Sequence, residues 1–211
     1  MKKAALHNLG CKVNAYETEA MQHLLEEAGY EIVPFTQKAD VYVINTCSVT
    51  NMADRKSRQM LHKAKKNNPD SIVVAAGCYV QTSEKEVLND LSVDIVIGND
   101  RKHDLVRLLE EYSLDSVNDT VDDINDGKHD FEELFIDQTK EHTRAFIKVQ
   151  DGCNQFCSYC IIPYARGRVR SRRFENVIAE VERLAANGFK EVVLTGIHLS
   201  SYGVDFEEAT G

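Results

Sequence analysis

The stretch Ile72-Val-Val-Ala-Ala-Gly-Cys78 is a short, uninterrupted apolar run that closes with a glycine and a cysteine. Apolar runs of this length are typical of strands that are buried on both faces of a parallel sheet. Three further runs have a similar form: Ala4–Leu9 before Gly10-Cys11, Val41–Asn45 before Thr46-Cys47, and Val93–Ile97 before Gly98. The first hundred residues therefore predict four buried strands.

Amphipathic helices are predicted between these strands. Asn14 through Ala28 carries its apolar residues on one stripe, and Gly29 stands where a helix stop is expected. Thr50 can cap a second helix that runs to about Asn67, and a third is predicted near Leu105–Leu109. Strands that alternate with helices indicate an α/β fold, here a parallel sheet built from βαβ units.

Three cysteines follow three of the predicted strands. Cys11, Cys47 and Cys78 each stand just beyond a strand's carboxyl end. These ends lie at one edge of a parallel sheet, where open α/β sheets bind ligands. Taken singly, each cysteine could be a small core residue. Their shared position instead predicts that the three thiols converge on one metal site.

Residues 113–142 differ from the sequence on either side. Aspartate and glutamate dominate this segment, and few large apolar residues precede Phe131. We interpret it as an acidic, solvated linker between a unit of residues 1–112 and a second unit of residues 143–211. An ordered acidic hairpin around Asn125-Asp126-Gly127 is the alternative.

The second unit has the order strand, cysteine-rich loop, helix, strand. The strands are predicted at Ala145–Val149 and Glu191–Leu194, with the helix at Phe174–Ala186 between them. This is the order that opens a β/α barrel. A complete barrel needs several more such units, so we expect a truncated barrel and a chain that is a fragment of a longer protein.

The loop Cys153-Asn-Gln-Phe-Cys157-Ser-Tyr-Cys160 carries three cysteines at CxxxCxxC spacing. Three thiolates on a [4Fe–4S] cluster leave one iron open to bind a small molecule. Structural zinc sites normally use four ligands. A zinc site or a redox disulfide is the alternative interpretation.

Composition narrows the class of protein. The net charge of −9 argues against a surface that coats nucleic acid, so any RNA contact must come from a local patch. No secretory leader or membrane-spanning run is visible, which predicts a cytoplasmic protein without membrane association. In the cytosol, six cysteines are better read as thiols or metal ligands than as disulfides.

With both sets of cysteines located, the chain resembles the radical S-adenosylmethionine (SAM) methylthiotransferases. Four segments carry the resemblance: Leu9-Gly-Cys-Lys-Val-Asn-Ala-Tyr-Glu-Thr18, Asn45-Thr-Cys-Ser-Val-Thr50, Ala76-Gly-Cys-Tyr79, and Cys157-Ser-Tyr-Cys-Ile-Ile-Pro-Tyr-Ala-Arg-Gly-Arg-Val-Arg-Ser-Arg172. The resemblance as a whole covers nearly all of the chain apart from the acidic segment. The residues after Cys11 and the run Gly196–Gly203 look most like the branch that acts on threonylcarbamoyladenosine (t6A) in tRNA.

This resemblance implies an enzyme that adds a methylthio group to C2 of t6A next to the anticodon, at position 37 of tRNA. The isopentenyladenosine tRNA enzyme is the alternative within the family. Outside it, an iron–sulfur or metal-binding module without SAM chemistry remains an alternative. The 211 residues alone are expected to be inactive, because the rest of the barrel and any further RNA-binding domain are absent.

The resemblance also implies the cofactors, which are two [4Fe–4S] clusters and SAM. Cys153, Cys157 and Cys160 would hold the cluster that cleaves SAM to a deoxyadenosyl radical. The trio after the strands would hold an auxiliary cluster that carries sulfur. Tyr159 and Gly196 would contact SAM. A donor such as flavodoxin or ferredoxin would supply the electron, and no side chain is assigned as a catalytic acid or base.

Five arginines follow the cysteine loop: Arg166, Arg168, Arg170, Arg172 and Arg173. They form the densest positive run of the chain. Phosphate contacts from such a run would orient tRNA beside the loop, and the first four are the predicted RNA-binding residues. The alternative is a solvated loop that uses arginine for solubility, or arginines that form intradomain ion pairs with the acidic segment.

Overall fold

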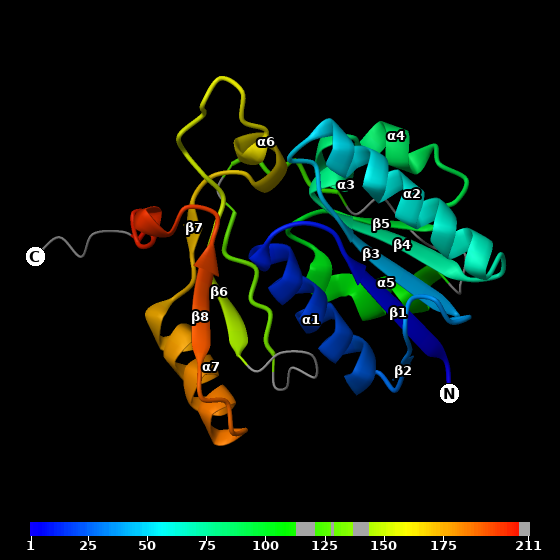
Figure 1. Ribbon diagram of the computed structural model, residues 1–211. Coiled ribbons are helices and arrows are strands. Elements are labelled where there is room, and N and C mark those ends of the chain that lie inside the picture. Colours follow the sequence, from blue (N-terminus) through cyan, green and yellow to red (C-terminus); the bar gives the residue numbers. More distant parts are fainter. Residues whose placement is uncertain (113–120, 128, 137–143, 207–211) are drawn as a thin grey trace, which may run out of the picture.

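A computed structural model describes residues 1–112, 121–127, 129–136 and 144–206 (Figure 1). The N-terminal unit contains the strands β1 (Lys3–Asn8), β2 (Glu31–Ile32), β3 (Val41–Thr46), β4 (Ile72–Gly77) and β5 (Ile95–Ile97). Its helices are α1 (Lys12–Glu27), α2 (Asn51–Asn67), α3 (Cys78–Thr82), α4 (Glu84–Leu88), the 3-10 turn η1 (Lys102–Asp104) and α5 (Leu105–Tyr112).

The five strands form one parallel sheet in the order β2-β1-β3-β4-β5. Helices cover both faces, as Figure 1 shows. Leu61 of α2 and Val80 of α3 pack on one face, whereas Met21 of α1 and Leu108 of α5 pack on the other. Burial on both sides explains why these strands are apolar throughout rather than alternating.

The second unit is a smaller sheet with one helix against it. It contains β6 (Ala145–Asp151), α6 (Ile162–Arg166), β7 (Arg170–Ser171), α7 (Phe174–Ala186), β8 (Val192–Gly196) and the 3-10 turn η2 (Leu199–Ser201). The strand order is β7-β6-β8, with β8 parallel to β6 and β7 antiparallel to it. Val177 and Leu184 of α7 pack on the apolar side chains of β6. This is the strand, helix, strand unit that opens a β/α barrel.

The two units meet along α1, which contacts β6 and β8 as well as its own sheet (Figure 1). Part of the acidic segment is packed into this junction. Leu134 and Ile136 are buried against Tyr16 and Ala20 of α1. These four side chains fasten the segment to α1 through apolar contact.

The predicted α/β fold is confirmed, and most strand and helix bounds agree to within about two residues. The interpretation of the acidic segment as a solvated linker is wrong for residues 129–136, because Leu134 and Ile136 are buried. No strand occurs among the described residues of 121–136, so the hairpin alternative is wrong there too, although Asp126 closes a turn with Asp123. Residues 113–120, 128 and 137–143 lie outside the described part.

Candidate functional site

Three cysteines stand at the carboxyl edge of the N-terminal sheet. Cys11 precedes the first turn of α1, Cys47 directly follows β3, and Cys78 is the first residue of α3. The strands are in register here, since Thr46 pairs with Gly77 at the ends of β3 and β4. The backbone therefore places all three cysteines at one edge of the sheet, as predicted.

The loops that carry this edge trio (Cys11, Cys47 and Cys78) lie at the same end of the sheet. A Cβ atom placed on Gly10 would lie 3.2 Å from Cys47 Sγ, so the loop before Cys11 touches Cys47. Burial raises the pKa of the Cys47 thiol, and the neighbouring Cys78 and Cys11 raise it further. Cys47 and Cys78 are buried and Cys11 is exposed, which leaves the trio accessible from one side.

Two asparagines fix the edge trio. Asn14 donates through Nδ2 to the carbonyls of Leu9 and Thr46, at 3.0 and 2.9 Å, and its Oδ1 lies 3.6 Å from Cys11 Sγ. Asn99 Nδ2 lies 3.7 Å from Cys78 Sγ. Both asparagines are buried, and their amides donate hydrogen bonds to backbone carbonyls near the cysteines.

The second trio, Cys153, Cys157 and Cys160, lies on the loop between β6 and α6. Cys157 is exposed, and the other two are half-buried. Backbone bonds shape the loop at both ends: Cys153 N donates to Gly167 O at 3.1 Å, and Cys160 N donates to Cys157 O at 2.9 Å. We refer to these three residues as the loop trio. Tyr159, the predicted SAM contact, projects into solvent with 91% of its surface exposed.

Gly196 ends β8 beside the start of this loop. A Cβ atom there would lie 3.0 Å from the side chain of Gln150, so a larger residue would force Gln150 to shift. Gln150 donates to Gly152 O at 2.8 Å and accepts from His198 N at 2.7 Å. It thereby joins the loop trio to the turn after β8. No sequence signal singled Gln150 out.

A buried ion network crosses the junction between the units. Glu17 of α1 lies 2.9 Å from Arg166 and 3.0 Å from Lys148, and Lys102 is 3.4 Å away. Asp151 lies 3.0 Å from Arg166 and 3.3 Å from Lys148. All five side chains are almost completely buried.

These contacts set the ionisation of the carboxylates. Burial alone would raise the pKa of Glu17, but the three surrounding cations hold it well below its usual range. The pKa of Asp151 is lowered in the same way, chiefly by Arg166. Asn14 and Glu17 could have been suspected from the sequence, because they are polar residues beside the apolar stripe of a helix and so need buried partners.

The arginine run divides into buried and exposed members. Arg166, Arg170 and Arg172 are buried, whereas Arg168 and Arg173 are exposed. Arg170 pairs with Asp100, and Arg172 pairs with Glu180 and with Glu133. The structure thus gives the three buried guanidinium groups internal partners, which does not support their predicted contact with RNA. Arg168 alone of the four predicted residues presents its guanidinium to solvent.

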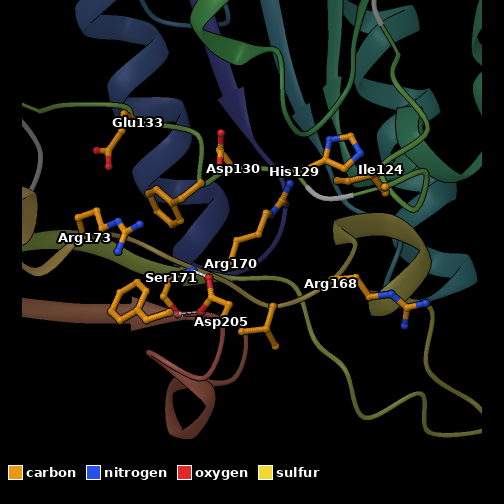
Figure 2. Close-up of a pocket in the computed structure, with 13 residues that line it drawn as sticks. Ile124, His129, Asp130, Glu133, Arg168, Arg170, Ser171, Arg173 and Asp205 are labelled. Carbon is orange, nitrogen blue, oxygen red and sulfur yellow. Dashed lines mark hydrogen bonds between the residues drawn. The ribbon is translucent and has the colours of Figure 1, made fainter. Parts of the chain in front are cut away.

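A cavity of about 380 Å³ lies beside these arginines (Figure 2), and no cysteine lines it. Arg168, Arg170 and Arg173 line it together with Phe131, Phe206 and Asp205. Asp205 accepts from the backbone N–H of Ser171 at 2.8 Å. The buried Nε of Arg170 has no hydrogen-bond partner among the described residues.

The donor sets fit iron–sulfur clusters better than single ions. The six cysteines of the chain fall into two trios, and neither has a fourth cysteine. Within the described residues, no three His, Cys, Asp or Glu side chains are arranged to hold one metal ion. In a cubane cluster each thiolate binds a different iron, so three thiols suffice and one iron stays open. No described helix has the length and apolar character that crossing a bilayer requires.

Comparison with known proteins agrees with this division. Residues 3–98 match the uncharacterized protein family UPF0004, and residues 147–209 match the radical SAM superfamily. The radical SAM methyltransferase TsrM from Kitasatospora setae, in a structure with cobalamin and a [4Fe-4S] cluster, has a similar fold. Its TM-score is 0.61 at 15% identity, over 95% of this chain and 48% of that one.

Curated relatives are much closer in sequence. The threonylcarbamoyladenosine tRNA methylthiotransferase MtaB of Bacillus subtilis is 47% identical over 99% of this chain and 46% of its own length. MtaB of Aquifex aeolicus is 46% identical over 96% of this chain and 50% of its length. A tRNA-2-methylthio-N(6)-dimethylallyladenosine synthase of Thermoanaerobacter sp. is 36% identical over 96% of this chain and 44% of its length. The chain spans about half the length of these relatives, and it belongs to the radical SAM methylthiotransferase family.

Proposed function

We propose that this chain is part of a tRNA methylthiotransferase that adds a methylthio group to C2 of t6A. The observation that carries the proposal is the edge trio, three cysteines brought together by a parallel sheet beside a CxxxCxxC loop. The t6A branch is favoured because the relatives from Bacillus subtilis and Aquifex aeolicus that bear that name are 47% and 46% identical. The dimethylallyladenosine relative, at 36%, makes the isopentenyl branch the second candidate.

In this proposal, Cys153, Cys157 and Cys160 hold one [4Fe–4S] cluster and the edge trio holds another. When bound, such clusters supply an electron that cleaves SAM and a site that carries sulfur. The contacts of α1 with β6 and β8 support this proposal, because they would keep the two cluster sites next to each other. Tyr159 is free to lie against the adenine of SAM, since its ring is exposed. Gly196 keeps the carboxyl edge of β8 open for the same ligand.

RNA contact is assigned in this proposal to Arg168 and Arg173, which flank the cavity shown in Figure 2. Both are exposed, and within the described residues neither has a carboxylate partner within ion-pair distance. The Nε–H of Arg170 in the same cavity wall, which has no partner among the described residues, would donate a hydrogen bond to a phosphate oxygen. Phosphate contacts of this kind position an RNA without reading its sequence.

The proposal also covers the two units of the chain, its substrates, its electron donor and its compartment. Residues 1–112 and 143–211 act as two units, which the two separate sheets support. The substrates are t6A-bearing tRNA and SAM. The electron comes from a small donor such as flavodoxin or ferredoxin, and the protein acts in the cytoplasm.

Mass spectrometry of tRNA nucleosides tests the proposed activity. Cells lacking the protein are expected to lose methylthio-t6A and to retain the methylthio-isopentenyl product. Complementation with the wild type or with Ser158→Ala should restore methylthio-t6A, because Ser158 is an exposed neighbour of the cluster ligands. Complementation with Cys157→Ala should not. Loss of the isopentenyl product alone would instead assign the chain to the other branch.

A further inference from the structure

Arg166 follows the cysteine loop in the sequence, and its side chain contacts α1 of the N-terminal unit. It is the last residue of α6, shortly after Cys160, and its side chain is fully buried. The guanidinium crosses the junction: Nη1 lies 2.9 Å from Glu17 Oε1, and Nη2 lies 2.7 Å from Asn14 Oδ1. A planar group with several donors can hold both partners at once.

One amide group separates this guanidinium from the edge trio. The Oδ1 atom of Asn14 that accepts from Arg166 is also 3.6 Å from Cys11 Sγ. The Nδ2 atom of the same residue holds the carbonyls of Leu9 and Thr46, which lead into Cys11 and Cys47. Arg166 therefore fixes the side chain that orders two of the three cysteine loops.

A second amide joins the same short helix to the third cysteine. Asn99 Nδ2 donates to Ala165 O at 2.6 Å and lies 3.7 Å from Cys78 Sγ. Lys102 Nζ holds Asn99 Oδ1 at 2.8 Å. The end of α6 thus reaches the edge trio at two points, and α6 also packs against α3, which begins with Cys78.

Arg166 is fully buried, and Cys47 and Cys78 are also buried, so its charge is poorly screened from these two members of the trio. Arg166 and Cys78 interact electrostatically, as do Arg166 and Cys47. A buried charge is poorly screened, so a fixed cation favours added negative charge nearby. Hydrogen bonds to the sulfurs of a cluster and charges near it change the reduction potential of that cluster.

We propose that Arg166 is a positioning residue that couples the two cysteine sites. It fastens the end of the cluster loop to the N-terminal unit, and it raises the reduction potential of a cluster held by Cys11, Cys47 and Cys78. The proposal rests on the proposed function, because it requires a cluster at the edge trio.

A redox titration followed by electron paramagnetic resonance tests the electrostatic part. The background is the protein with all three loop cysteines changed to alanine, reconstituted anaerobically, so that only the edge cluster contributes. Arg166→Met should shift the midpoint potential to more negative values, because the fixed cation is lost. Arg166→Lys should stay near the wild-type potential, because the positive charge is kept. An equal shift in both variants, or none in Arg166→Met, would overturn the proposal.

Arg172 supplies the matched control. It is also buried and ion-paired, with Glu180 and Glu133. Arg172→Met should therefore leave the midpoint potential unchanged, even if it lowers stability as Arg166→Met does. A similar shift from both methionine variants would mean that Arg166 acts only through folding.

The positioning part is tested with all six cysteines present. Arg166→Lys cannot hold Asn14 and Glu17 together, so iron in the loop cluster should be lost faster to a chelator than in the wild type. Equal loss would contradict the coupling. Iron and sulfide analysis of the three-alanine background decides the underlying proposal separately: absence of a cluster there rejects the proposed function, whereas a cluster with an unmoved potential rejects only the role of Arg166.

Discussion

The edge trio and the loop trio use the same residue type and are held in opposite ways. Cys47 and Cys78 are buried at the ends of paired strands, and asparagine amides fix the backbone around them. No member of the loop trio is buried, and its backbone bonds run mainly within the loop and to Gly167. Sheet register positions the first site, whereas local backbone conformation shapes the second.

The contrast matters because neither site stands alone. Arg166 ends the helix after the loop trio, and its partner Glu17 lies on the helix that begins at Cys11. The buried ion network therefore links the helix that follows the loop trio to the helix that follows Cys11. Changes to the network should affect both trios, whereas changes within either loop should affect one.

The largest effect is expected from Glu17→Gln. This change leaves Arg166, Lys148 and Lys102 around a neutral amide in the buried junction. Removing one partner of a buried ion pair typically costs about 3–5 kcal/mol. We expect a loss of that size in the free energy of unfolding, measured by urea denaturation. Because the pKa of Glu17 is depressed, its stabilisation is present above about pH 4.3 and is lost as the pH falls towards the folded pKa.

Glu27→Gln is the control for this change. Glu27 lies at the end of the same helix, and its side chain is 62% exposed beside His23. An exposed pair of this kind contributes little, so the loss should stay below about 0.5 kcal/mol. Equal losses for the two variants would show that the buried network does not hold the units together.

A smaller effect is expected from alanine at the glycines that precede the cysteines. Gly77 has φ +95°, and a Cβ atom there would lie 2.5 Å from Asn45 Oδ1. Gly29 has a similar φ of +84° but nothing within 4 Å. Both alanines carry the backbone strain, so Gly77→Ala should cost about 1–3 kcal/mol more than Gly29→Ala because of the added overlap. Urea denaturation of the two variants measures the difference.

Gly152 is the corresponding glycine before the loop trio. Its Cβ atom would lie 1.8 Å from Arg168 O, and Gly188, with φ +93° and open space, is its control. If the loop trio depends on local backbone, Gly152→Ala should greatly reduce iron bound by the loop while the edge cluster remains. Loss of iron from both sites would contradict the separation.

The edge trio was predictable because its signal is local. An apolar run followed by a cysteine marks a strand end, and parallel strands bring such ends together. The two-residue strands β2 and β7 were not predicted, because pairs as short as Glu31–Ile32 carry no periodicity. The start of α2 was predictable, since the Thr50 hydroxyl caps it by accepting from Ala53 N at 3.1 Å.

The arginine run shows what the sequence could not give. The sequence shows five arginines in a short stretch but not the carboxylates that pair with them. The run by itself therefore indicates a charged surface, although three of its members are buried. Arg166, Arg170 and Arg172 each pair with a carboxylate from a distant part of the chain, namely Glu17, Asp100 and Glu133, and pairing at such separation leaves no local pattern. The acidic segment misled for the same reason: its charges were visible, but the burial of Leu134 and Ile136 against α1 was not.

Alkylation of the reduced, metal-free protein tests whether the sheet edge keeps two of its cysteines buried without a cluster. Cys157 and Cys11 are exposed, whereas Cys47 and Cys78 are buried. Alkylation by iodoacetamide, followed by peptide mass spectrometry, should label the exposed pair at least about tenfold faster. Labelling should become uniform in urea. Fast native labelling of Cys78 would mean that the sheet edge does not preorganise the first site.

The smallest expected effect is a pH dependence at the edge of the junction. His103 Nδ1 lies 3.2 Å from Glu132, and this hydrogen bond raises the pKa of His103 above 6.5. A raised folded pKa gives stabilisation that is full below the unfolded value and is lost as the pH rises through the folded one. Wild type should therefore exceed His103→Gln in unfolding free energy by more at pH 6 than at pH 8. In a Glu132→Gln background the same comparison should give a difference that no longer changes with pH, because the carboxylate that favours the charged imidazole is gone. A pH dependence that persists in that background would assign the effect to Asp104, the other carboxylate near this imidazole.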